Sequence, residues 1–241
     1  MYTGDLSAVT DLTTLTSLVT FTANKVTAVI GQDGANAGAA LYLHYGKSIS
    51  CLGAALGAVA LSKVSESVAW VAKFDISDGS ECDVPAFSNG SLLSSLSDNL
   101  INSINTQRYV FLRKFVGIPG SYFNDNHCAC SPSSDYAYIS DNRTIDKAIR
   151  GIYTSLLPDL NGPLVLNANG TLTDATIASL ESDARAPLDV MVRDAELSTY
   201  GVVIDPAQNV LGTNKVVVQV TDIQVGVARN IEVDIKNAKS L

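Results

Sequence analysis

The chain has 241 residues, 46% of them hydrophobic and 17% charged, which suits one large domain or two small ones with a real core and argues against intrinsic disorder. A formal net charge of −8 argues against partners that need a basic face, such as nucleic acid or an anionic membrane. The first ten residues lack a signal-peptide pattern, and the longest apolar stretch is too interrupted by polar residues to span a membrane. Four cysteines are too few for a disulfide framework, so a reduced cytosolic compartment is expected.

The first half of the chain alternates between short strands and helices. Residues 35–63 place apolar side chains three to four positions apart, and residues 67–76 alternate at the two-residue period of a half-buried strand. The predicted elements are a buried strand at 25–31, a polar turn at 32–34, one broken or two abutting helices within 35–63, a strand at 67–76, a helix at 92–104, a strand at 108–116 and a long loop at 117–134. This order predicts an α/β core with a partly parallel sheet.

The second half is predicted to contain longer helices and then strands. Thr173 stands where it can cap a helix over residues 174–194, which Pro187 kinks or divides, and Asn169-Gly170 marks a tight turn. The other predicted elements are a short strand at 136–139, a helix at 145–157 capped by Asp141 or Asn142, a hairpin-like turn over 164–172 and a strand at 200–204. Helices followed by strands predict a smaller α+β unit.

The segment from residue 215 to residue 235 has the pattern of extended strand. Its apolar residues alternate, and the phase slips by one position at Thr221–Asp222, which fits a β-bulge or a tight turn. The alternating residues are Val216, Val218, Val220, Ile223, Val225, Val227, Ile231, Val233 and Ile235. Such a terminus either completes the chain's own sheet or offers an extra strand to a neighbour.

The candidate chemistry of the sequence concentrates in residues 123–130, FNDNHCAC. The metal-ligand types there are Asp125, His127, Cys128 and Cys130. Their spacing is poor for zinc, and a Cys128–His127 nucleophile pair is disfavoured because adjacent residues on an extended loop point apart. The sequence also lacks the Gly-x-Ser-x-Gly, phosphate-loop and dinucleotide-binding motifs. We therefore predict no catalytic, cofactor-binding or metal-binding residue.

Several spaced blocks of the sequence resemble the tail sheath proteins of contractile phages. The carrying blocks are SKVSESVAWVAKFDISDG (62–79), RYVFLRKFVGIPGSYFNDNHC (108–128), YAYISDNRTIDKAIRGIYTSLLPDLNGPL (136–164), LDVMVRDAELSTYGVVIDPAQNVLGTNKVVVQV (188–220) and GVARNIEVDI (226–235). The pattern is most similar to the branch in phages and prophages of gut Bacteroidetes, a DUF2586-like family formerly of unknown function. The resemblance covers most of the chain from about residue 6 onward.

The resemblance implies a structural protein. Sheath subunits form stacked hexameric rings around an inner tube above a baseplate, and they hold one another through terminal arms that add strands to neighbouring sheets. It implies a non-catalytic, subtilisin-like α/β core over residues 1–135 and a C-terminal sheath domain over residues 136–241. It also implies a location in the virion tail, after assembly in the bacterial cytoplasm. Strand exchange falls to the alternating residues of 216–235, and contact with the tube is expected at Arg185, Asp189 and Arg193.

Two other functions remain open from the residues. The chain is a hydrolase or metal-binding enzyme that uses His127, Cys128 and Cys130, or it is a monomeric tail adaptor whose terminal strands fold back onto their own sheet. Sheath proteins of this type are usually longer, so an N-terminal domain and its donor arm are expected to be absent, as in a truncated gene, a fragment or a minimal variant.

Overall fold

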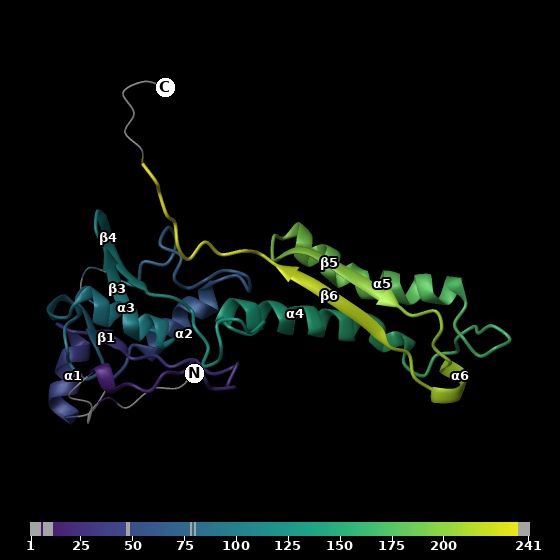
Figure 1. Cartoon of the computed structure of the whole chain (residues 1–241), viewed down its shortest axis with the longest axis horizontal. Helices are drawn as coiled ribbons and strands as arrows, with labels where there is room; N and C mark the ends of the chain where they lie inside the picture. The colour runs from purple at the N-terminus through teal and green to yellow at the C-terminus, as the bar shows by residue number, and fades with distance from the viewer. Residues whose placement is uncertain (1–5, 7–11, 47–48, 78, 80, 236–241) are drawn as a thin grey trace, which may run out of the picture.

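The structure is a computed structural model that describes residues 6, 12–46, 49–77, 79 and 81–235. Figure 1 shows a body, built mostly from the first half of the chain, and a long arm formed by α4, α5, β5 and β6. Helices combine with two-stranded antiparallel sheets, which confirms the α+β class. No helix among the described residues is both long enough and apolar enough to cross a membrane.

The body contains short elements joined by many turns. They are η1 (Leu12–Thr14), β1 (Gly31–Asp33), α1 (Ala37–Tyr45), α2 (Leu52–Leu61), β2 (Pro85–Phe87), η2 (Leu93–Ser95), α3 (Asp98–Thr106), β3 (Leu112–Phe115) and β4 (Ile118–Phe123). Strands β1 and β2 pair antiparallel, as do β3 and β4. Among the described residues, the parallel part of the expected mixed sheet is one bridge between Val29 and Val110.

This bridge lies in the most deeply buried layer of the body. Successive side chains of an extended segment point to opposite faces. Ile30 and Phe111 therefore pack on one side with residues of α3 and η1, and Val29 and Val110 pack on the other side with α2. A layer covered by helices on both faces explains why residues 28–30 read as a buried strand in the sequence.

The prediction of a strand at residues 67–76 is wrong. The main chain there forms turns, in which the amide of Phe74 donates to the carbonyl of Trp70 at 2.9 Å. The Lys73 ammonium pairs with Glu66 at 2.6 Å and lies 5.2 Å from the centre of the Phe74 ring. These local contacts turn the chain, although its apolar residues alternate as they would in a strand.

Three other predictions for the body need correction. Residues 32 and 33 belong to strand β1, where a polar turn was expected. The helix predicted at 92–104 is interrupted at Ser97, whose hydroxyl accepts from the Leu100 amide and caps α3. The loop predicted at 117–134 contains β4, because Gly117 adopts a φ of 84° and lets the chain reverse from Phe115 to Ile118.

The arm contains the longest helices of the described chain. Its elements are α4 (Ile139–Leu156), η3 (Leu157–Asp159), α5 (Asp174–Arg193), β5 (Leu197–Ile204), α6 (Val210–Thr213) and β6 (Val218–Gln224). The side chains of α4, α5 and the β5–β6 ribbon share one core, with Ala184, Leu188 and Met191 at its centre. Helix α5 and its Thr173 cap are as predicted, and Pro187 does not divide the helix.

Helix α4 begins six residues earlier than predicted. Asn142 was expected to cap a helix that starts at residue 145, but it lies inside the helix. Its amide donates to the carbonyls of Asn24, Tyr136 and Tyr138, so this side chain holds the preceding loop against the body. The strand predicted at 136–139 is reduced to one bridge between His127 and Tyr138. The domain boundary between residues 135 and 136 stays a prediction.

Candidate assembly surface

The β5–β6 ribbon carries three of the nine residues predicted to join subunits, Val218, Val220 and Ile223. Its strands pair antiparallel, with Val202 opposite Val220 and Ile204 opposite Val218. Val218 and Val220 are half-buried and pack into the core of the arm, together with Tyr200 and Val202. The inner face of this ribbon is therefore used within the chain itself.

The phase slip predicted at Thr221–Asp222 does not occur in the backbone of β6. Burial alternates through the strand without interruption, and the irregularity of the ladder lies between Leu197 and Thr199 on β5. Asp222 and Gln224 therefore take the inward positions, whereas Ile223 lies on the outer face with 57% of its surface exposed. The one-position slip is therefore in the sequence of apolar residues, and the backbone of β6 itself is regular.

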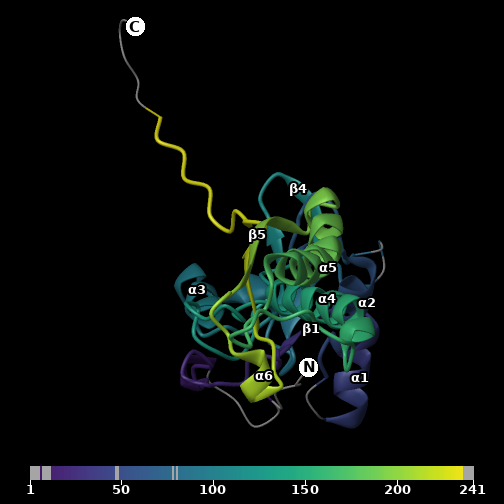
Figure 2. The ribbon, with the colours of Figure 1, turned by 90° about the vertical axis from the view of Figure 1, so that its right-hand side faces the viewer.

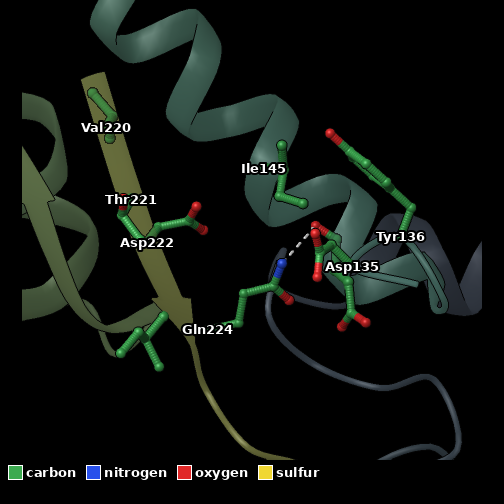
Figure 3. Close-up of a pocket in the computed structure, with 9 residues that line it drawn as sticks. Asp135, Tyr136, Ile145, Val220, Thr221, Asp222 and Gln224 are labelled. Carbon is green, nitrogen blue, oxygen red and sulfur yellow. Dashed lines mark hydrogen bonds between the residues drawn. The ribbon is translucent and has the colours of Figure 1, made fainter. Parts of the chain in front are cut away.

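The inward position of Asp222 faces an open pocket of about 580 Å³ between β6 and the start of α4 (Figure 3). The lining residues are Asp135, Tyr136, Asp141, Ile145, Val220, Thr221, Asp222, Ile223 and Gln224. Gln224 closes one side, since its amide donates to the carbonyl of Asp141 at 3.4 Å. Burial raises the pKa of the Asp141 carboxyl, and no described residue hydrogen-bonds to Oδ2 of Asp222. The groove beside β6 is thus acidic, with three carboxyl groups and no lysine or arginine in its lining.

The two outer edges of the ribbon differ. At the β5 edge, Arg185 donates to the carbonyl of Val202 at 3.0 Å, and Glu181 accepts from the amide of Ile204 at 3.2 Å. The main-chain groups of these two β5 residues therefore point away from β6. In an antiparallel pair, when the N–H and C=O of one residue point away from the partner strand, those of the residue directly opposite do the same. The N–H and C=O groups of Val218 and Val220 therefore point away from β5. Outside the ladder, no described residue bonds to the main chain of either valine, which leaves the β6 edge open.

The segment after β6 leaves the ribbon as an extended chain. Residues 225–235 pair with no described strand and run away from the arm (Figures 1 and 2). Ile231, Val233 and Ile235 are 81%, 71% and 85% exposed, and Val225 is also exposed. The strand predicted for this segment therefore does not form within the described chain, although its extended course agrees with the alternating sequence.

The residues predicted to touch the tube divide into two groups. Arg185 binds β5 as described above, and Asp189 accepts from the hydroxyl of Tyr200. Arg193 is 74% exposed in its side chain and lies 3.9 Å from the carboxylate of Asp194. Two of the three side chains thus stabilise the ribbon, and tube contact stays a prediction.

The FNDNHCAC segment forms the junction between body and arm, and it is buried. Burial is the main cause that lowers the pKa of His127 to about 4, and Nε2 of this neutral ring lies 3.2 Å from Oδ1 of Asn105. Burial also raises the pKa of the Cys128 thiol to about 11, so this group is protonated at neutral pH. No cluster of three His, Cys, Asp or Glu side chains among the described residues could hold a metal ion. Burial thus keeps Cys128, the thiol proposed beside His127 as a nucleophile, in its protonated form at neutral pH.

The buried His127 predicts a loss of stability in acid. The unfolded chain binds a proton near pH 6.5, whereas the folded chain does so only near pH 4, so stability is fully present above pH 6.5 and falls as the pH drops toward 4. Between pH 7 and pH 5 this group alone should cost about 2 kcal/mol. Urea titrations of the wild type and of His127→Gln at both pH values measure it. An equal acid loss in the two proteins would contradict the expectation.

Sequence reasoning missed Asp222, Gln224 and Arg229 as members of this surface. The polar residues at 222 and 224 looked like a break in the strand, because nothing in the sequence places the start of α4 beside them. Arg229 did carry a signal, as the one cation between residues 216 and 235. Its partners lie about a hundred positions earlier in the chain, so the sequence pattern could not predict which residues it binds.

Comparison with known protein families assigns the chain to one of them. Residues 7–127 match the family model described as "DUF2586, N-terminal domain", and residues 135–241 match "DUF2586, C-terminal domain". The chain therefore belongs to the DUF2586 family. No curated protein matches it.

Among solved structures, the chain is similar to components of contractile assemblies. They are the PVC sheath complex of an extracellular contractile injection system in its contracted state (TM-score 0.49, 16% identity, 60% of this chain and 41% of that one), the baseplate of the anti-feeding prophage (0.47, 17%, 61% and 41%) and the contracted helical sheath of the same prophage (0.46, 18%, 59% and 40%). The alignments thus span about two fifths of those longer chains.

Proposed function

We propose that this chain is a structural subunit of the sheath of a contractile phage tail or a phage-derived injection apparatus, and that it joins copies of itself by strand exchange. One observation carries the proposal. Residues 225–235 form an extended, exposed segment without a partner strand in the described chain, and the outer edge of β6 leaves the main-chain groups of Val218 and Val220 open. A donor strand and an acceptor edge on one chain are what a self-assembling subunit requires.

The energetics favour exchange between copies. Each main-chain hydrogen bond contributes roughly 1 kcal/mol net, so a strand of several residues gains several kcal/mol at an open edge. The alternation of Ile231, Val233 and Ile235 adds an apolar face that becomes buried when the segment joins a sheet. Because the segment runs away from its own ribbon, these groups are available to a second copy.

The acidic groove adds charge complementarity to the acceptor. The donor segment carries Glu232 and Asp234 and continues into Lys236 and Lys239 in the sequence. The groove beside β6 is lined by the carboxyl groups of Asp135, Asp141 and Asp222, so the groove favours registers that bring the lysines, and not the two donor carboxylates, beside it. Opposite charges at such a site favour one register of the added strand over others.

The finer parts of the proposal come from the sequence resemblance. The copies stack as hexameric rings around an inner tube, above a baseplate, in a virion tail that is assembled in the bacterial cytoplasm. Arg193 is the exposed candidate for tube contact. No side chain is assigned a reaction, so the chain acts through its main-chain edges.

Binding of a labelled peptide tests the acceptor. We expect a fluorescent peptide of residues 225–241 to bind the full chain, and Val220→Pro to weaken this binding at least about tenfold. The proline removes an outward N–H and leaves the N–H groups that face β5 in place. Gln219→Val is the matched control, since it changes an exposed side chain of β6 outside the lining of the groove, and circular dichroism verifies the fold of both variants. Unchanged binding by Val220→Pro would exclude this edge.

A further inference from the structure

Arg229 in the terminal segment contacts the junction that joins β4 to α4. Its Nε lies 3.2 Å from both carboxylate oxygens of Asp125, and its Nη2 lies 3.5 Å from Oδ1 of Asn126. The guanidinium also stacks on Tyr138, with Cζ 3.3 Å from the ring centre. Three side chains of one loop therefore surround this cation.

The hydrogen-bond partners of Arg229 are buried, whereas most of the terminal segment is exposed. Asp125 and Asn126 are buried, and the side chain of Arg229 is 29% exposed, although the residue as a whole, with its main chain, is exposed. The flanking residues Ala228 and Asn230 are exposed, and so is the chain from residue 231 to 235. The terminal segment is thus attached near its root and projects beyond it.

Arginine suits this attachment better than lysine would. Its planar group can stack on a tyrosine ring and still direct N–H groups at a carboxylate and an amide oxygen, whereas an ammonium group is a compact point charge. Partly buried, charge-assisted contacts of this kind are stronger than exposed surface pairs. The geometry is that of a fixed anchor.

We propose that Arg229 is a positioning residue, which clasps the root of the terminal segment to Asp125, Asn126 and Tyr138 and so fixes the direction in which residues 230–235 reach a second copy. The identity of the acceptor rests on the proposed function, but the clasp itself does not. A donor held in one direction loses less conformational freedom on binding, and this preorganisation strengthens association without any new contact.

The clasp is tested by a distance distribution in the full-length chain. Genetically encoded spin labels at Tyr153 on α4 and Val233 in the segment report the direction of the tail. We expect a narrow distribution in the wild type, a broad one in Arg229→Ala and an intermediate one in Arg229→Lys. Arg150→Ala, at an exposed arginine of α4, is the matched control and should match the wild type. If Arg229→Ala does not fold, Tyr138→Leu removes the stacked ring instead and should also broaden the distribution.

Self-association of the wild type and the same variants without spin labels, followed by analytical ultracentrifugation, tests the consequence. We expect Arg229→Ala to weaken association at least about fivefold and Arg150→Ala to leave it unchanged. An unaltered distance distribution in Arg229→Ala and Tyr138→Leu would overturn the clasp. A broadened distribution with unchanged association would overturn the positioning role. A wild type with a narrow distribution and no association would refute strand exchange, and the positioning role with it, while the clasp would stand.

Discussion

A chain that ends at residue 225 should fold as the full chain does and should lose its association with other copies. Residues 226–235 form no described strand and bury little surface, so their removal costs mainly the Arg229 contacts. We expect the free energy of unfolding to fall by about 1–2 kcal/mol. Self-association should weaken more than about tenfold, because the donor strand is gone. Urea denaturation and analytical ultracentrifugation measure the two effects separately.

A full-length control separates the donor from the anchor. Replacement of Ile231, Val233 and Ile235 by serine keeps Arg229 and the length of the chain, but removes the apolar face of the donor. This variant should match the wild type in stability and resemble the truncated chain in association. A loss of more than about 3 kcal/mol on truncation, the scale of a lost core strand, would instead place the segment in its own fold and favour the monomeric adaptor.

Elements whose signals are local could be predicted from the sequence. Helix α5 begins at the Thr173 cap, where the hydroxyl accepts from the Thr176 amide. The turn around Asn169-Gly170 forms with an antiparallel bridge between Leu166 and Leu172. In both places a side chain or a dipeptide determines the main-chain conformation within a few residues, so the pattern and the structure agree.

Elements that depend on distant partners could not be predicted. The alternation at 67–76 matches a strand, but a strand also needs a neighbour, and this segment satisfies its main chain largely in turns. Asn142 looks like a cap until the loop that it holds is folded beside it.

The candidate surface also has a part that local sequence patterns predict and a part that depends on distant residues. The alternating valines and isoleucines located the ribbon and the terminal segment. Which strand edge stays open depends on Glu181 and Arg185 of α5, and the anchor of the segment depends on Asp125 of the junction. These are contacts between residues that are far apart in the sequence.

The junction itself depends on Arg108, which sequence reasoning assigned only to a strand. This residue is 2% exposed and adopts a φ of 72°, a left-handed conformation that side chains other than glycine rarely take. Its guanidinium donates to the carbonyls of Cys128 and Ala137 and lies 5.0 Å from the ring centre of Tyr138. One buried cation thus ties both ends of the loop before α4.

Replacement of Arg108 should therefore be costly. Arg108→Ala removes two charge-assisted hydrogen bonds and leaves a cavity, and we expect a loss of about 3–5 kcal/mol in the free energy of unfolding. Arg108→Gly loses the same contacts but adopts the positive φ without strain, so it should be about 1 kcal/mol more stable than the alanine variant. Urea denaturation at pH 7 gives both values. Equal stability of the two variants would show that no strain is stored at this position.

Arg108→Gly should also make the direction of the terminal segment less well defined. Asp125 and Tyr138, which hold Arg229, flank the loop that Arg108 ties down. If Arg108→Gly folds, its spin-label distance between residues 153 and 233 should broaden as it does in Arg229→Ala, although no hydrogen bond or ion pair between described residues joins Arg108 to the tail. A narrow distribution in Arg108→Gly would show that Asp125, Asn126 and Tyr138 keep their positions without this cation, and that the direction of the donor is independent of the junction.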